Sequence, residues 1–463
     1  EGARLAAAIF LLVLMIFNLM FISVGVGKFA EEFLPLPRWE ATLIVLAVVG
    51  VYVTLGGFFG VILTDILQTV LIAAGAVIMA VMVFARPAAA TFISKDPAWF
   101  SLAPTWTLWS GFAAETPPAY QHFGLFGPLL AAGFFWMIFR VLSGPNVWDF
   151  QFFLTTRSPR DAQLAAGMWT VGYNLRWVLG VAFMVLGIFY LGTQAGFDAE
   201  KIMPLVLLEM PIGLRGMFMA VLLAALMSTI SAMINVTSSV VINDFIKRYV
   251  ARDLSQKQLV RLGQVASVAA VLVGFVFSLT FTDVVTAWET MVFVVVTVIL
   301  VPATLRWHWW RLGAKAFVWS MAVSAVLISL RLVFVRGLHA SVSLSLDVGI
   351  GLVTTLAAAA LTRPADMEVL VKFYAKVRPF GFWGPVRREC VRRGLVPAGD
   401  KMPRIDMLNG VVTAAFQFSL AILPFYLFMR NWTQLGLWAG AAAAIAVVLY
   451  FTWYKNLPSK NEI

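Results

Sequence analysis

Residues 216–243 read GMFMAVLLAALMSTISAMINVTSSVVIN and contain no charged side chain. A helix needs about 20 consecutive apolar residues to cross the hydrocarbon core of a bilayer, and this stretch is longer than that. Further charge-free stretches occur along the chain, at residues 5–27, 41–64, 66–85, 262–282, 407–429 and 431–454. The sequence therefore predicts an all-α polytopic membrane protein.

The composition of the chain supports this class and excludes others. The 463 residues are 61% hydrophobic and 12% charged, with a mean hydropathy of +0.89, whereas a soluble domain has about 25% charged residues. One cysteine allows no internal disulfide, and three scattered histidines allow no dense metal cluster. The net charge of +11 is typical of basic cytoplasmic loops, so we expect the lipid bilayer as a partner and no nucleic acid.

About twelve membrane spans are expected, joined by loops of unequal charge. They cover residues 4–29, 40–57, 61–85, 128–154, 162–193, 214–244, 259–282, 285–306, 315–335, 342–362, 408–429 and 432–454. Most Lys and Arg residues fall in alternate loops, and loops of this kind are cytoplasmic. We therefore predict a multi-pass protein of the cell inner (plasma) membrane with a cytoplasmic C-terminus.

The long loop at residues 363–407, expected on the cytoplasmic side, is strongly basic. It holds a cluster formed by Arg387, Arg388, Arg392 and Arg393. Basic residues near a membrane surface are attracted to anionic lipid by about 1 kcal/mol each. The cluster therefore indicates either anchoring to the membrane or a site that docks a partner.

Asp65, with Gln68 three residues later, lies at the expected cytoplasmic start of the third span. Ionisable residues within spans are rare and are functional candidates by default. One interpretation is helix capping after the Gly56-Gly57 turn, because an acidic residue near a helix N-terminus satisfies free N–H groups. The other interpretation is a carboxylate on a cation path at the inner mouth. The local sequence leaves both open.

Two arginines, Arg140 and Arg176, lie deep inside expected spans. A charge at the bilayer centre costs at least about 2.5–3.5 kcal/mol, so each must face a partner or a water-filled cavity. Asp149 and Glu289 are the carboxylates considered as partners in the spans. The alternatives are a structural ion pair and a guanidinium that faces the solute.

The segment Ser143-Gly144-Pro145-Asn146 interrupts the fourth span. Proline removes a backbone donor and glycine loosens a helix, so this span should be kinked or unwound near mid-membrane. Irregular backbone at that depth is tolerated where it is buried or lines a cavity, and broken helices are where secondary transporters bind their cargo. Packing alone also produces such kinks.

The sixth span has a face of small residues that includes Ala225, Ser228 and Thr229. Such faces often serve close helix packing. The two hydroxyl groups and the Ala225 carbonyl also place several hard oxygen atoms within one turn, which suits a hard cation. Spacing alone does not decide between packing and sodium binding.

Several motifs, in this order, resemble the sodium/solute symporter family, which includes the sodium–glucose and sodium–proline cotransporters. The resemblance is found in four segments: residues 52–57 (YVTLGG) leading to 64–68 (TDILQ), residues 151–162 with the SPRDA loop, residues 213–244 with GLRG, AALMST and the final Asn-Asp, and residues 378–385 (RPFGFWGP). The resemblance implies a five-plus-five inverted-repeat (LeuT-like) core. We expect this core at residues 1–310 and additional helices, with the basic loop, at 311–463.

The resemblance also implies site residues. Family members bind sodium through a backbone oxygen and two hydroxyl groups of one core helix, which match Ala225, Ser228 and Thr229, and the aspartate on the inner sodium path matches Asp65. The positions that match solute contacts in sugar-transporting members are Asn146, Trp148 as a gate-like aromatic, Arg176 in place of a lysine, and the neighbourhood of Glu289.

Two departures from the family pattern affect these expectations. Gln151 is followed by Phe152 where the family usually has arginine. By this alignment the first span is the third core helix, so the first two core helices are missing. We expect that the chain as written cannot transport, whereas the intact gene product does.

The expected function is sodium-coupled secondary active symport that imports a small polar solute by alternating access. The alternatives are a transporter-like solute sensor and a non-transporting fragment. No nucleophile–base cluster or P-loop is found, so we expect no enzyme activity and no organic cofactor. Na⁺ is the expected co-transported ion. Arg176 favours an organic acid or amino acid over a sugar, and we expect a monomer or weak oligomer.

Overall fold

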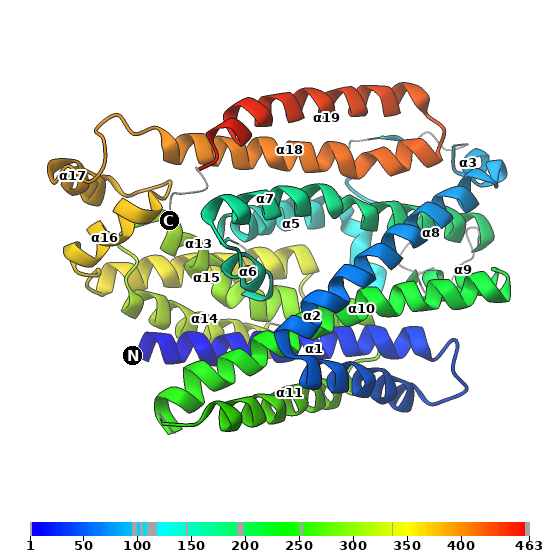
Figure 1. Ribbon diagram of the computed structural model, residues 1–463, viewed down its shortest axis with the longest axis horizontal. Coiled ribbons are helices and arrows are strands. Elements are labelled where there is room, and N and C mark those ends of the chain that lie inside the picture. Colours follow the sequence, from blue (N-terminus) through cyan, green and yellow to red (C-terminus); the bar gives the residue numbers. More distant parts are fainter. Residues whose placement is uncertain are drawn as a thin grey trace. The chain divides into compact units, whose positions relative to one another are not determined.

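The computed structural model describes residues 2–94, 100–101, 105–108, 118–144, 147–191, 199–250, 253–335 and 337–458. These residues form helices and no strands (Figure 1). Eleven of the helices found there are long and apolar enough to cross a membrane, or up to 12 if the bent pair Val284–Val292 and Thr297–His308 is one span. All-α architecture and about twelve spans are thus confirmed.

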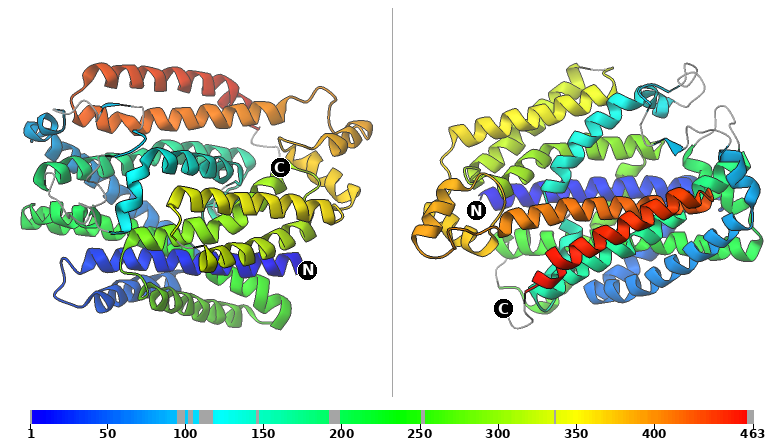
Figure 2. Two further views of the ribbon diagram at one scale, coloured as in Figure 1. Left: turned by 180° about the vertical axis from the view of Figure 1, so that it is seen from behind. Right: turned by 90° about the horizontal axis from the view of Figure 1, so that it is seen from above.

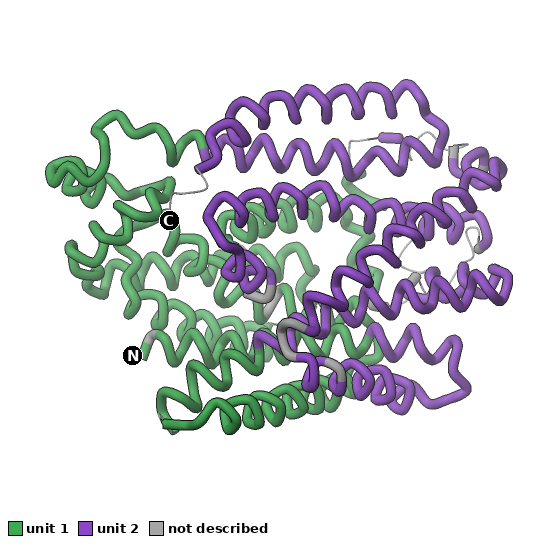
Figure 3. Tube along the Cα trace, in the orientation of Figure 1, with its two compact units in different colours: residues 1–24, 104–146, 237–405 green, residues 25–103, 147–236, 406–463 purple. Residues whose placement is uncertain are grey.

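The chain divides into two compact units, each made of segments distant in the sequence (Figure 3). Unit 1 comprises Glu1–Val24, Pro104–Asn146 and Thr237–Ile405. Unit 2 comprises Gly25–Ala103, Val147–Val236 and Asp406–Ile463. Helices α1 (Gly2–Ala30), α10 (Ile212–Val240) and α18 (Met402–Phe428) contribute to both units.

Unit 1 contains most of the helices from the middle of the chain. They are η2 (Pro118–Leu125), α5 (Phe126–Leu142), the π-helix η4 (Val241–Val250), α11 (Gln256–Ser278), α12 (Val284–Glu289), the π-helix η5 (Thr290–Val296), α13 (Thr297–His308), α14 (Ala314–Phe334), α15 (Ala340–Leu361), α16 (Met367–Val377) and α17 (Gly384–Arg392). Within this unit α15 packs against α14, α13 and α5.

Besides its part of α10, unit 2 contains the other helices that carry the candidate site. They are α2 (Arg38–Phe84), α3 (Pro87–Ser94), α6 (Val147–Leu154), α7 (Pro159–Gly172), α8 (Asn174–Leu191), η3 (Ala199–Lys201), α9 (Ile202–Leu208), α18 (Met402–Phe428), α19 (Trp432–Thr452) and η6 (Tyr454–Asn456). Its apolar core is formed mainly by α2, α8, α9 and α10, with Met79, Leu186 and Phe218 fully buried.

The fourth expected span is broken, as predicted: α5 ends at Leu142 and α6 begins at Val147. The carbonyl groups at the end of α5 are satisfied by side chains, which is required because unpaired carbonyls are costly inside a membrane. Three side chains of α13 hydrogen-bond to them. Thr304 donates to the Phe139 carbonyl at 2.7 Å and Trp307 to the Ser143 carbonyl at 3.2 Å, and His308 Nε2 lies 3.1 Å from the Leu142 carbonyl oxygen.

Arg140 also hydrogen-bonds to the chain at this break. Its Nη1 donates to the carbonyl of Gly144 at 3.0 Å and to the hydroxyl of Ser143 at 3.3 Å. A cation at a helix C-terminus is stabilised by the free carbonyls there. Arg140 therefore has the partner that a charge inside a span requires: the backbone carbonyl that the break exposes.

An ion pair that the sequence analysis did not single out joins α14 to α15. Arg331 and Asp347 form a bidentate ion pair, in which Arg331 Nε lies 2.9 Å from Asp347 Oδ1 and Arg331 Nη2 donates to Asp347 Oδ2. The Asp347 side chain is fully buried. Asp347 lies within the expected span 342–362, so its position alone was a detectable signal. The pair satisfies both charges across the interface of the two helices.

The basic loop folds into the short helices α16 and α17, around a cluster that includes Val371, Trp383 and Val386. Gly381 has φ +126°, and a Cβ atom there would collide with the carbonyl of His308. Only glycine fits this close approach. The loop is thereby held against the end of α13, where Trp383 Nε1 donates to Trp307 O at 2.9 Å.

Part of the basic cluster is used inside this loop. Glu389 accepts from Arg392 and Arg393, and Arg393 also binds Glu368 at 2.7 Å. The Arg387 guanidinium donates to backbone carbonyls of residues 398 and 400. These bonds give the cluster a structural role that neither sequence interpretation, lipid anchoring or partner docking, had included.

Candidate functional site

Asp65 lies in the interior of α2, not at its start. Helix α2 continues from Arg38 to Phe84, its halves Arg38–Gly56 and Gly60–Phe84 are each long enough to span a membrane, and the halves run in different directions (Figure 1). The first four N–H groups of a helix are the ones that need capping, and Asp65 comes after that turn even when counted from Gly60. The capping interpretation is therefore wrong.

Two oxygen atoms on this turn of α2 are buried without a donor. Among the described residues, neither Asp65 Oδ1 nor Gln68 Oε1 has a hydrogen-bond partner, and Gln68 is only 6% exposed. Buried polar atoms are paired in the great majority of cases, so each exception needs an explanation. Two unpaired oxygen acceptors therefore lie one helical turn apart on α2.

Helix α10 faces this turn with the residues expected to bind sodium. The Ser228 hydroxyl is a hydrogen-bonding neighbour of the Asp65 carboxyl group. The hydroxyl of the next residue, Thr229, donates to the carbonyl of Ala225 one turn earlier, at 3.3 Å. The structure therefore brings Asp65, which lies one helical turn from Gln68, to the hydroxyl-bearing face of α10.

A cavity of about 440 Å³ lies next to this cluster in unit 2. Arg176 of α8 lines it together with Ala225 and Thr229 of α10, and apolar residues such as Phe29 and Phe183 form much of the remaining wall. The volume is within the range of about 300–1,000 Å³ that holds small-molecule ligands. Arg176, a predicted solute contact, and two predicted sodium ligands thus share one cavity.

The Arg176 guanidinium stands over the ring of Tyr173, 5.5 Å from its centroid. Its charge also acts on the Asp65 carboxyl group. Within the described part of unit 2 Arg176 makes no direct ion pair, so the interpretation that it forms one with Asp149 of the same unit is wrong. Glu289 belongs to unit 1, where its Oε1 lies 2.7 Å from His122 Nε2.

The remaining predicted solute contacts are less defined. Asn146 lies outside the described residues, and Trp148 is described only by its backbone, in the first turn of α6. Asp149 follows in the same turn. The structure brings together Asp65, Arg176, Ala225, Ser228 and Thr229. Gln68 was noted in the sequence only as a neighbour of Asp65, and its burial, which the sequence could not reveal, adds it to the cluster.

Comparison with known proteins gives a family match for this arrangement of helices. A model of the sodium:solute symporter family matches residues 2–98 and 163–324, which include every described residue of the cluster. The chain is 25% identical to the sodium/glucose cotransporter of Vibrio parahaemolyticus over 295 residues, which are 58% of this chain and 52% of that protein. It therefore spans about half the length of that relative.

Two further similarities extend over more of the chain. The sodium/myo-inositol cotransporter 2 of Oryctolagus cuniculus is 25% identical over 473 residues, covering 89% of this chain and 67% of that protein. Among solved structures, a substrate-bound, outward-open Na⁺-coupled sialic acid symporter matches with a TM-score of 0.59 and 20% identity, covering 79% of this chain and 75% of that one. The structural match supports the symporter fold.

Proposed function

The chain belongs to the sodium:solute symporter family, and on that premise we propose that its protein is a sodium-coupled symporter that imports a small polar solute by alternating access. Inward movement of one sodium ion down the membrane potential releases about 2.3 kcal/mol per 100 mV. That energy would drive uptake of the solute. The relatives named above are cotransporters of glucose and myo-inositol, which supports a solute of similar size.

The single observation that best supports this proposal is the oxygen cluster between α2 and α10. Asp65 Oδ1 and Gln68 Oε1 are buried acceptors without donors in the described structure, and Ser228 adds a hydroxyl oxygen at the same place. Hard cations bind carboxylate, carbonyl and hydroxyl oxygens. A sodium ion passing between Ala225, Ser228 and Thr229 and the Asp65 carboxylate would satisfy acceptors that the protein itself leaves unpaired.

Arg176 supports the choice of solute class. An arginine keeps its charge at any accessible pH, and its planar fork matches a carboxylate bidentately. In the 440 Å³ cavity this guanidinium is the only charged group among the lining residues. We infer that the solute carries a carboxylate or several hydroxyl groups that the guanidinium can bind, with an organic acid or amino acid favoured over a neutral sugar.

The wider assignments follow from the same proposal. We infer that Asn146, Trp148 and Glu289 contribute to the solute site, as the family resemblance implies. We assign residues 1–310 to the transporter core and 311–463 to additional helices. The distribution of Lys and Arg between loops supports a cytoplasmic C-terminus.

The proposal is tested with the double variant Ser228→Ala, Thr229→Ala in the full-length protein, by sodium-dependent uptake of labelled solutes into vesicles. Alanine packs well on a small-residue helix face, so we expect normal expression and a severalfold higher sodium requirement or no uptake. Ser239→Ala, an exposed position on the same helix, is the matched control and should behave as the parent. Unchanged sodium activation in the double variant would overturn the sodium assignment.

A further inference from the structure

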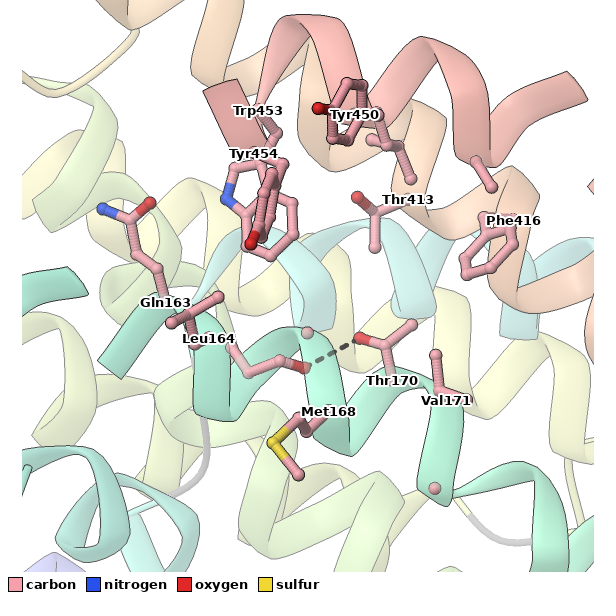
Figure 4. Close-up of a pocket in the computed structure, with 15 residues that line it drawn as sticks. Gln163, Leu164, Met168, Thr170, Val171, Thr413, Phe416, Tyr450, Trp453 and Tyr454 are labelled. Carbon is pink, nitrogen blue, oxygen red and sulfur yellow. Dashed lines mark hydrogen bonds between the residues drawn. The ribbon is translucent and has the colours of Figure 1, made fainter. Parts of the chain in front are cut away.

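A second cavity, separate from the candidate site, lies between α7 and the hairpin of α18 and α19 in unit 2 (Figure 4). The two hairpin helices run side by side in all views (Figure 2), and Phe418 contacts Trp438 edge to face with ring centroids 5.6 Å apart. The cavity has a volume of about 770 Å³ and shares no lining residue with the one that contains Arg176.

Most of the wall of this second cavity, called the groove from here on, is apolar. Leu164, Met168 and Val171 of α7 face Phe416 and Leu449 of the hairpin. Thr170 is also in the wall, but its hydroxyl is already used by a bond to the carbonyl of residue 166 at 3.0 Å. A groove of this chemistry, on helices that span the membrane, fits the hydrocarbon chain of a lipid.

One end of the groove is aromatic and polar. Trp453 and Tyr454 stand beside Gln163 at this end (Figure 4). Tryptophan and tyrosine concentrate at the level of lipid headgroups, where one end of the ring is apolar and the other is wet. The span Pro159–Tyr190 begins here and the span Trp432–Asn456 ends here, so this end of the groove lies at a membrane surface.

Two basic side chains from different helices flank the same end. Arg160, in the first turn of α7, donates from Nη1 to the carbonyl of Pro458 at 3.1 Å, which brings it next to the segment after α19. Lys455 lies over the rings of Tyr450 and Phe451, with Nζ 5.5 and 4.7 Å from their centroids, and Tyr450 lines the groove.

The positive charge at this end is not neutralised by the described residues. In the part of the chain that the structure describes, neither Arg160 nor Lys455 forms an ion pair with a carboxylate. Asp161 is adjacent in sequence, but its carboxylate accepts a bond from the Ser158 hydroxyl at 2.9 Å at the start of α7. An apolar groove with an aromatic rim and two cations that have no carboxylate partner among the described residues is complementary to an amphipathic anion.

We propose that this groove binds one anionic phospholipid. An acyl chain lies along the apolar wall formed by α7 and the hairpin, and the phosphate group lies between Arg160 and Lys455. Basic pockets between transmembrane helices bind acidic headgroups through the same charge interaction, and the long basic side chains reach the headgroup while their stems cover apolar surface. The site holds a structural lipid and does not depend on the transport function.

The test uses the purified full-length protein and native mass spectrometry, with phosphatidylglycerol or phosphatidylcholine of identical acyl chains added to the micelles. We expect the parent to retain one phosphatidylglycerol in preference to phosphatidylcholine. The double variant Arg160→Gln, Lys455→Gln should weaken phosphatidylglycerol retention by about 30-fold, the effect of two basic residues near a membrane surface. Lys257→Gln with Lys315→Gln, two exposed lysines at other helix starts, should have no effect.

A second pair of variants tests the acyl-chain part of the groove. Ala446→Phe places a large side chain in the groove and should reduce retention of both lipids, whereas Ala444→Phe, on another face of α19, should not. Quenching of Trp453 fluorescence by brominated phosphatidylglycerol, measured against Trp453→Phe, reports contact even if a variant folds poorly. Equal retention of both lipids by the parent, unchanged binding in the basic double variant, or a dimer that Ala446→Phe abolishes would each overturn the proposal.

Discussion

The hydroxyl group of Ser228 on α10 faces the carboxyl group of Asp65 on α2. The two residues are far apart in the sequence, and both were candidates for the sodium path for independent reasons. Their contact places the small-residue face of α10 and the acidic turn of α2 in one cluster. The charge of Arg176 also acts on Asp65, so the residues proposed for the cation and those proposed for the solute interact electrostatically.

Replacement of Asp65 by asparagine tests the cation path. Asn keeps the size of the side chain and its hydrogen bond to Ser228, so helix content and thermal stability should remain near those of the parent. Loss of the negative charge should raise the sodium concentration needed for half-maximal uptake by about tenfold, equivalent to about 1.4 kcal/mol. Asp366→Asn, at an exposed position before α16, is the control. An unaltered sodium requirement in Asp65→Asn would contradict the path.

Variants of Arg176 distinguish two possible roles for this residue, solute binding and charge balance for Asp65. If it binds a carboxylate, Arg176→Lys should fold normally but bind the solute about tenfold more weakly, because a point charge does not reproduce the bidentate fork. If it only balances Asp65, Arg176→Gln should lower the thermal stability, and adding Asp65→Asn should restore both stability and binding.

The measurements for Arg176 are thermal unfolding and solute binding. They are made on the parent, on Arg176→Gln, on Asp65→Asn and on the double variant that combines the two. Restored binding in the Arg176→Gln, Asp65→Asn protein would end the solute-contact hypothesis. A double variant that is stable and does not bind an anionic solute would support it. Binding is measured at saturating sodium, so that the higher sodium requirement expected for Asp65→Asn does not lower it.

Breaking the ion pair between Arg331 and Asp347 should strongly destabilise the packing of α14 against α15. Asp347→Asn leaves a largely buried guanidinium without its counter-charge, so we expect a loss of about 3–5 kcal/mol in stability. Replacing both partners, by Arg331→Met and Asp347→Leu, should be nearly neutral or stabilising, because desolvation of both charges is then avoided. Thermal unfolding of the three proteins checks this order, and a double variant weaker than Asp347→Asn would contradict it.

The loop of α16 and α17 should lose stability in acid through Glu389. Hydrogen bonds from Arg392 and Arg393 lower the pKa of Glu389 from 4.5 to about 2. A lowered pKa means that the ionised form stabilises the fold: the contribution is complete above pH 4.5 and is lost as the pH falls through about 2. Because its partner Arg392 is 74% exposed, salt should weaken this interaction.

The expected outcome is a difference in thermal unfolding between the parent and Glu389→Gln that is present at pH 6 and shrinks towards pH 2. The signal is the fluorescence of Trp383, which is buried in this loop. Glu40→Gln, outside the loop, should not show the same pH dependence. A parent–variant difference that is constant across this pH range would contradict the assignment.

The sequence alone determined the fold class and the positions of the spans. Each expected span overlaps a long helix or, for residues 285–306, the bent pair, because length and hydropathy of a segment are local properties that a bilayer selects directly. The break at residues 143–146 was predictable for the same kind of reason, since Gly144 and Pro145 act on their own backbone. The family motifs then indicated which helices carry the proposed site.

The partners of the charged residues were decided only by tertiary structure. Asp65 could equally have capped a helix, Arg176 could have paired with Asp149, and the buried Arg331–Asp347 pair was not singled out at all. Which groups meet depends on the rotation and crossing of helices that are distant in sequence, and neither property is encoded in a local pattern. Hydropathy shows that a charge in a membrane must have a partner, and only the packing of the helices shows which partner it has.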